Sequence, residues 1–282
     1  MSELSRRTVL RGLGAGAGAA AAAPGLLAGT AEAATPVVPP ARTGDNPVVL
    51  ENRAPGSDQW AVGCAETRRA DPVRPQIAGR ADRDSVAPGE TLRLRLSAPG
   101  ATVSVYRVGH YGGARARHLL TDADAGRVWT LKVPDTWVSG LFLAVLTTPD
   151  GYRAHVHFVV REPARPSGVL HVVSGEVGAE ASVVRWLEEE GYDVTYATGR
   201  DVREGRVDPA RYGALVHIGS RPATVRGARV VTLPRPFALS EPGRTEEAAR
   251  RTASALIEAA TAATAATAAT AATAAAVSRS RS

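Results

Sequence analysis

Two glutamates closely follow a short apolar segment and are the first candidates for acid–base chemistry. Glu176 and Glu180 come just after residues 169–173, which are Val-Leu-His-Val-Val. Open α/β sheets bind ligands beyond the carboxyl ends of their strands, so a carboxylate there could act as a general acid or base. Acidic side chains are also favoured at the positively polarised start of a helix. We favour that solvated, structural role for both residues.

Three other side chains could supply a base or a nucleophile. His217 lies inside the apolar segment 214–218, where a single histidine is typical of a core position. Ser220 follows that segment, but no Gly-x-Ser-x-Gly turn surrounds it. Cys64 lies in the preceding β-rich region, far from any predicted strand-to-helix turn. A thiol nucleophile of the amidotransferase kind is therefore not expected at Cys64.

His155 and His157 could bind a metal ion together with a third ligand, because residues two apart share one strand face. The same spacing describes an exposed polar face, which we favour. Four aromatic residues could form a platform for stacking a sugar ring: Tyr106, Tyr111, Trp129 and Trp137. Core packing and turn anchoring account for most of them. A tight turn accounts for the glycines in the loop from Gly109 to Gly113.

The elements that must position these side chains differ between two regions. Residues 51–162 alternate with period two, and apolar Leu92, Leu94 and Leu96 are separated by Arg93 and Arg95. Turn pairs such as Pro-Gly at 88–89 and 99–100 and Asp-Gly at 150–151 separate the short segments. Several short strands with this spacing predict an antiparallel β-sandwich of immunoglobulin-like type.

From residue 168 the pattern alternates between strands and helices. Strands are expected at 169–173, 192–196, 214–218 and 229–233, and a short turn or helix is expected at 208–212. Helices are expected at 181–190, ended by Gly191, and from 246 to 259 or beyond. This alternation predicts a small parallel sheet in an α/β domain at 163–260, after a linker at 163–167. Residues 34–50 form a second linker, and the Thr-Ala-Ala tail at 261–282 is expected to fray because it lacks large apolar side chains.

The first 33 residues resemble a twin-arginine export signal. Arg6 and Arg7 precede a weakly apolar segment, and Ala33 ends a small-x-small cleavage pattern. We therefore expect a secreted or periplasmic protein whose partner is the twin-arginine export machinery. Apart from this signal, no stretch is expected to reach the length of a membrane span, so no stable membrane anchor is predicted.

Composition limits the remaining function classes. The net charge is +6, and Lys132 is the only lysine. The arginines are interspersed with acids and form no basic helix face, so nucleic-acid binding is not expected. Cys64 is the only cysteine, so stability must come from hydrophobic cores rather than disulfides.

Several stretches of the sequence resemble one family. The two most specific are Tyr-Arg-Val-Gly-His-Tyr-Gly-Gly at 106–113 and Trp-Leu-Glu-Glu-Glu-Gly-Tyr-Asp-Val at 186–194, and others lie at 51–56, 84–90 and 137–144. Over residues 51–219 the chain resembles the C-terminal region of the large (beta) subunit of N,N-dimethylformamidase and its secreted relatives. The resemblance implies a β-sandwich joined to a three-layer α/β domain similar to class I glutamine amidotransferases.

The resemblance also implies hydrolysis of a small amide by a mononuclear iron that two tyrosines and a glutamate hold. Such an iron would act as a Lewis acid. This chain departs from the family where those ligands should lie, since it lacks the long aromatic-rich insertion after the first α/β strand. Residues 219–223, Gly-Ser-Arg-Pro-Ala, take the place of a Gly-His-Asp-Glu-Tyr-Trp segment. No iron ligand is carried over to any position, and no cofactor is expected.

The combined expectation is an exported, shortened N,N-dimethylformamidase-like protein that is catalytically degenerate and serves as a binding or structural module. One alternative is a secreted amidohydrolase that acts on small amides through an acid such as Glu176. The other is a protein that binds carbohydrate or cell wall through the sandwich.

Overall fold

The computed structural model describes residues 42, 44–62, 67–174, 177–219, 229–233 and 244–279. All of them belong to one compact unit, Thr35–Ser282. Several sequence predictions fall outside the described residues: the export signal with Arg6, Arg7 and Ala33, and the side chains of Cys64, Glu176 and Ser220.

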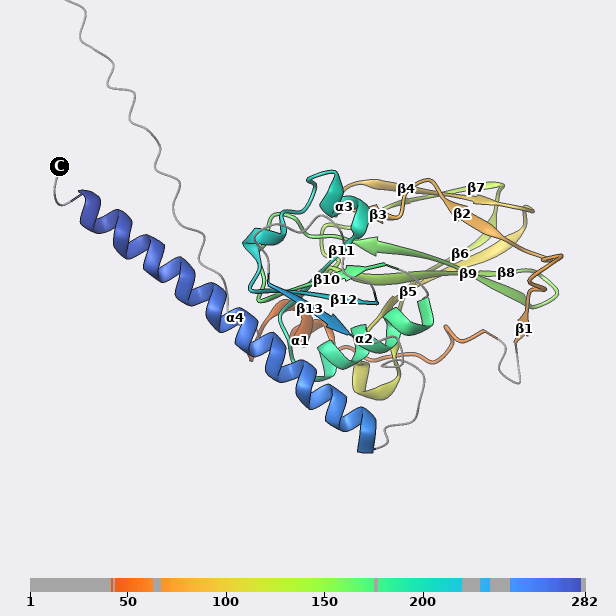
Figure 1. The fold of residues 1–282 in the computed structure, drawn as a ribbon. Helices are drawn as coiled ribbons and strands as arrows, with labels where there is room; N and C mark the ends of the chain where they lie inside the picture. The colour runs from red at the N-terminus through yellow and green to blue at the C-terminus, as the bar shows by residue number, and fades with distance from the viewer. Residues whose placement is uncertain are drawn as a thin grey trace, which may run out of the picture. The chain divides into compact units, whose positions relative to one another are not determined.

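Two sheets make up the β-rich region (Figure 1). The larger one has six strands, with the order β1 (Arg68–Arg69), β9 (Tyr152–Val160), β8 (Gly140–Thr147), β5 (Ala101–Val108) and β6 (Ala116–Ala125), and β3 (Ser85–Val86) also pairs with β9. The smaller sheet has the order β2 (Gly79–Ala81), β4 (Thr91–Leu96) and β7 (Val128–Lys132). The long strands pair antiparallel as predicted, but β1 and β3 pair parallel to β9. The region is therefore not wholly antiparallel.

The two sheets enclose one hydrophobic core, as the period-two pattern predicts. Along β4, Leu92, Leu94 and Leu96 are buried and the intervening arginines are exposed. From the larger sheet, Phe142 and Phe158 pack into the same core with ring centroids 5.4 Å apart. Along β9, alternate residues face this core and the opposite side of the sheet, because successive strand side chains point to opposite faces.

The four aromatic residues considered as a sugar platform do not share a surface. Trp129 is buried and donates from Nε1 to Asp122 Oδ2 at 2.8 Å, and Trp137 stacks on Phe142 at 5.0 Å. Tyr106 and Tyr111 are also buried. The interpretation as core packing and turn anchoring is confirmed.

The second region contains a four-stranded parallel sheet, as predicted. Its order is β11 (Val194–Thr198), β10 (Val169–Val173), β12 (Ala214–Ile218) and β13 (Val230–Leu233). One face packs against α2 (Val177–Glu189), α4 (Arg244–Arg279) and apolar residues of β5, β8 and β9. The other face has a smaller core, covered by the segment that contains α3 (Gly199–Arg203) and the 3₁₀ turn η2 (Pro209–Arg211).

Some boundaries differ from the sequence predictions. The helix α2 begins at Val177, four residues before the expected start, and Gly191 ends it with φ of +74°, as expected. The predicted linker 34–50 overlaps α1 (Pro47–Glu51), which Asn46 caps and whose Val48 is buried. The short helix α3 and the 3₁₀ turn η1 (Tyr111–Gly113) were not predicted.

The predicted fraying of the tail is wrong in the structure, because α4 continues through the Thr-Ala-Ala repeats to Arg279. Threonines along the tail donate to the carbonyl four residues earlier, and Thr264 Oγ1 also donates to Gly213 O at 2.8 Å. The stretch Glu247–Ala276 is long and apolar enough, by length and composition alone, to cross a membrane. The prediction that no other stretch reaches that length is therefore wrong, while the absence of a membrane anchor stays a prediction.

Candidate functional site

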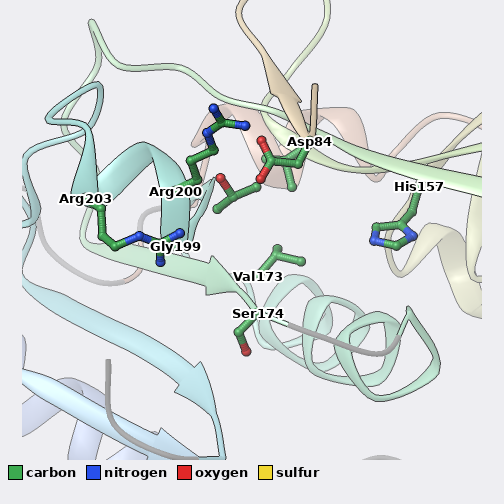
Figure 2. A pocket seen from close by; sticks show the side chains of 9 residues that line it. Asp84, His157, Val173, Ser174, Gly199, Arg200 and Arg203 are labelled. Carbon is green, nitrogen blue, oxygen red and sulfur yellow. The ribbon is translucent and has the colours of Figure 1, made fainter. Parts of the chain in front are cut away.

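A pocket of about 300 Å³ lies where β10 and β11 end (Figure 2). Val173, Ser174 and Thr198 come from these carboxyl ends, and α3 continues directly from β11. The β-rich region contributes Asp84, just before β3, and His157 and Val159 of β9. Ligands of open α/β sheets commonly bind at this position, so the pocket is the leading candidate site.

The side chains in this pocket favour an anionic ligand. Figure 2 shows Arg200 and Arg203 extending from α3 and His157 facing them from the opposite side. The lining holds two arginines and one acidic residue, Asp84, and Arg200 Nε also donates to Glu204 Oε1 at 2.6 Å. Burial lowers the pKa of His157, although Glu180 and Asp84 act in the opposite direction. The imidazole is therefore neutral at pH 7, and the lining carries net positive charge.

Asp201 holds α3 and its two arginines in place. It is fully buried and accepts hydrogen bonds from Thr198 N at 2.8 Å, Thr198 Oγ1 at 2.7 Å and Ser85 Oγ at 2.6 Å. Arg206 Nη1 donates to the same carboxylate at 2.7 Å. Burial alone would raise the pKa of Asp201, but these bonds outweigh it and hold the pKa below its ordinary value. Because Ser85 belongs to β3, this carboxylate joins the β-rich region to the wall of the pocket.

The predicted solvated role of Glu180 is wrong, because its side chain is buried beneath the pocket. Its Oε1 accepts from Ser174 N at 2.8 Å and from Ser174 Oγ at 3.2 Å, and Oε2 lies 2.9 Å from His171 Nε2. His171 Nδ1 lies 3.1 Å from the carbonyl of Val216, which can only accept, so Nδ1 carries a hydrogen. Since α2 begins at Val177, Glu180 lies within the first turn and faces the sheet.

This arrangement is not a nucleophilic triad. The serine bonds to the carboxylate instead of to the imidazole, so His171 is not placed to accept a proton from Ser174. The three residues instead fix the end of β10 against the start of α2. Burial would raise the pKa of Glu180, but the bonds from His171 and Ser174 prevail and hold the pKa below its ordinary value.

The lowered pKa of Glu180 predicts a loss of stability in acid. Its ionised form stabilises the fold above the ordinary value of 4.5, and this contribution disappears as pH falls through the lower folded pKa. The melting temperature of wild type should exceed that of Glu180→Gln near neutral pH, and the difference should shrink as the pH falls below the ordinary value of 4.5. The exposed Glu247→Gln substitution is the control. A difference that does not change with pH would contradict this role of Glu180.

The other predicted candidates form no common site among the described residues. His155 Nε2 lies 2.9 Å from the carbonyl of Trp60, and His157 lies at the pocket described above. Among the described residues, no group of three or more His, Cys, Asp or Glu side chains could hold a metal ion. His217 is buried and its Nε2 lies 2.8 Å from Thr232 Oγ1, so the core interpretation is confirmed.

The two most specific stretches of the family resemblance contact each other in a buried cluster. Arg107 of β5 and Glu188 of α2 form a two-pronged ion pair, with Nη2–Oε1 at 2.8 Å and Nη1–Oε2 at 3.1 Å. Arg107 Nη1 also donates to Tyr111 Oη at 3.0 Å, and Tyr196 Oη donates to Glu188 Oε1 at 2.9 Å. We call these four side chains the Arg107–Glu188 cluster.

Two of the other stretches that resemble the family, 51–56 and 137–144, contact the same cluster. Asn52 Nδ2 donates to Glu188 Oε2 at 2.8 Å, and the carbonyl of Ser139 accepts from Arg107 Nη2 at 2.8 Å. A side chain at Gly109 would overlap Glu188 Oε2, and one at Gly140 would lie 2.8 Å from Arg107 Nε. The glycines are thus required by the close approach of a buried ion pair, in addition to the tight turn that the sequence predicts.

The Arg107–Glu188 cluster does contain two tyrosines and a glutamate, but this donor set does not fit iron. Both oxygens of Glu188 are bound by the guanidinium of Arg107. Burial raises the pKa of Tyr111 and of Tyr196 strongly, which opposes formation of the phenolates that would bind the metal. The positive charge of Arg107 also occupies the place beside the carboxylate where a cation would bind.

Comparison with known proteins supports the resemblance over part of the chain. Residues 102–177 match the family described as N,N-dimethylformamidase beta subunit-like, C-terminal. The match runs from the second residue of β5 to the first residue of α2. The stretches at 51–56, 84–90 and 186–194 lie outside it. A comparison with curated proteins found no match.

Solved structures show only weak likeness. A superoxide reductase (neelaredoxin) from Ignicoccus hospitalis is 14% identical over 30% of this chain and 79% of its own, with a TM-score of 0.21. A cycloisomaltooligosaccharide glucanotransferase from Paenibacillus sp. is 11% identical over 64% of this chain and 26% of its own, with a TM-score of 0.22. At these TM-scores the likeness carries no argument about function.

Proposed function

We propose that the chain is an exported, dimethylformamidase-related module that binds a small carboxylate and has lost iron-dependent amide hydrolysis. The observation that carries the proposal is the pair Arg200 and Arg203, which face the pocket where β10 and β11 end. A guanidinium recognises a carboxylate through two parallel hydrogen bonds. The neutral amide substrate of a hydrolase would gain much less from these charges.

The relation to dimethylformamidase rests on the match over residues 102–177. Within this proposal, the two sheets of the β-rich region form an immunoglobulin-like sandwich, and the parallel sheet is a shortened amidotransferase-like domain. The order of the parallel strands, β11-β10-β12-β13, and the packing of α2 and α4 on one face of the sheet support the second assignment. Export through the twin-arginine pathway rests on Arg6, Arg7 and Ala33 of the sequence.

Loss of hydrolysis is proposed on the chemistry of the described side chains. In the Arg107–Glu188 cluster, Tyr111 and Glu188 are bound to Arg107 and Tyr196 is bound to Glu188. Glu180 is bound to Ser174 and His171. Neither carboxylate is placed to activate water in the pocket. The alternative in which Glu176 acts as the acid concerns a residue outside the described part of the chain.

Binding of succinate, compared with the neutral diamide succinamide, tests the proposal by isothermal titration calorimetry. Wild type should bind succinate, and Arg200→Ala combined with Arg203→Ala should weaken binding about tenfold or more, because hydrogen bonds to charged groups contribute about 1.5–3 kcal/mol. Arg93→Ala, an exposed arginine of β4, is the control. The proposal is refuted if wild type binds succinate and succinamide with equal affinity. It is also refuted if the double variant binds succinate as tightly as wild type does.

A further inference from the structure

A second cavity lies between the larger β-sheet and the start of α2. Its volume is about 370 Å³, and it shares no lining residue with the pocket at β10 and β11. Apolar side chains make up most of its wall: Trp60, Val62, Val108, Leu143, Val177 and Ala181. A dry cavity of roughly 150 Å³ is enough to hold benzene, so this one has room for an aromatic ring with a short chain.

The polar side chains of this cavity are basic. Arg69, Arg115 and Arg185 line it, and no Asp or Glu is among its described lining residues. Arg185 is oriented by its own helix, since Nε donates to Ala181 O at 3.2 Å and Nη2 to Ser182 Oγ at 3.0 Å. His155 is the fourth polar side chain, and burial lowers its pKa, to which Arg69 adds. An apolar cavity with three arginines is complementary to an amphipathic anion.

The backbone at Arg115 gives independent evidence that its side chain has a role. Arg115 has φ of +75°, a left-handed conformation that glycine adopts without strain and an arginine does not. The turn is held by backbone hydrogen bonds of Arg115: its N donates to His110 O at 3.3 Å, and its carbonyl accepts from Gly109 N at 3.1 Å. These bonds do not involve the arginine side chain. Strained residues of this kind are concentrated at functional sites.

Trp60, the aromatic residue that lines the cavity, is held in position by hydrogen bonds. Trp60 Nε1 donates to Ala114 O at 3.2 Å, and the Trp60 carbonyl lies 2.9 Å from His155 Nε2. These bonds hold the indole beside Arg115, so little ordering is needed when a ligand enters. A preformed apolar cavity with a few placed polar groups is the usual form of a small-molecule site.

We propose that this second cavity binds a free amphipathic carboxylate, with its apolar body against Trp60 and Leu143 and its carboxylate at Arg115, Arg69 and Arg185. The site is separate from the small-carboxylate pocket of the proposed function. Arg115 is the residue that determines specificity for the charge, and the apolar wall selects for the body of the ligand.

Calorimetric titration of the full chain with 4-phenylbutyrate tests this site, with 4-phenylbutanamide and acetate as probes that lack the charge or the apolar body. We expect 4-phenylbutyrate to bind at least tenfold more tightly than either. Arg115→Gly should bind it at least tenfold more weakly while its melting temperature stays equal to or above that of wild type, because glycine relieves the strain. Arg115→Lys should bind more tightly than Arg115→Gly, since it restores the charge.

Two controls separate this site from the rest of the molecule. Arg95→Ala, on the exposed side of β4, and the double variant of Arg200 and Arg203 should both bind 4-phenylbutyrate as wild type does. The proposal is overturned if wild type does not prefer 4-phenylbutyrate over its amide, or if Arg115→Gly keeps wild-type affinity. Loss of binding in the Arg200 and Arg203 variant would also overturn it, because the ligand would then occupy the other pocket.

Discussion

Replacing Arg107 by methionine is expected to lower the free energy of unfolding by about 3–5 kcal/mol. Arg107 is only 1% exposed and Glu188 only 4%, so the substitution leaves an ionised carboxylate buried without its cation. The hydrogen bonds that Arg107 donates to Tyr111 and to the Ser139 carbonyl are lost as well. Because Arg107 belongs to β5 and Glu188 to α2, the loss should loosen the contact between the two regions.

Urea denaturation followed by circular dichroism measures this effect. The double variant Arg107→Met with Glu188→Leu should recover much of the stability, because replacing a buried ion pair by apolar residues of similar volume is often neutral. Arg251→Met is the matched control, since Arg251 forms an exposed pair with Glu247 and should lose less than about 1 kcal/mol. A loss in Arg107→Met no larger than in this control would contradict the role given to the cluster.

Replacing Asp201 by alanine is expected to cost about 2–3 kcal/mol, because it leaves several buried donors without their acceptor. Ser85 Oγ and Thr198 N both lose a partner in the interior, and Arg206 loses an ion pair. The same change removes the capping box of α3, the helix to which Arg200 and Arg203 belong. Succinate binding should therefore weaken together with stability.

Thermal unfolding and succinate titration of the Asp201→Ala variant check both expectations. Asp208→Ala is the control, because Asp208 is exposed and caps only η2, where it accepts from Ala210 N at 3.0 Å. That substitution should cost about 1 kcal/mol and leave succinate binding unchanged. A variant at Asp201 that melts and binds like wild type would show that α3 is held by other contacts.

The local pattern of apolar and polar residues is sufficient to predict most strands of the sheets. The alternation of β4 follows from its leucines and arginines, and β12 lies at the predicted residues 214–218. The prediction that the tail frays rests on its lack of large apolar side chains and is wrong. In the structure, small residues allow a close approach, and Thr261 packs where a side chain at Gly213 would overlap it.

The candidate site could be predicted only in part. The carboxyl end of β10 was identified as the place for a ligand, but the charges that line the pocket come from α3, which is too short to show periodicity. The signal that could have found it is Thr198 followed by Asp201, a capping box. The pairing of Arg107 with Glu188 joins residues 81 apart in sequence, so no local pattern reveals that the two stretches bury a common ion pair.

The central claim is that the tyrosines and the glutamate of the Arg107–Glu188 cluster stabilise the fold and bind no iron. Titration of the purified full chain with Fe(III), followed by visible absorption of tyrosinate-to-iron charge transfer and by metal analysis, tests it most directly. We predict no charge-transfer band and no stoichiometric iron after desalting. One tightly bound iron per chain with such a band, accompanied by release of dimethylamine from N,N-dimethylformamide, would contradict the account.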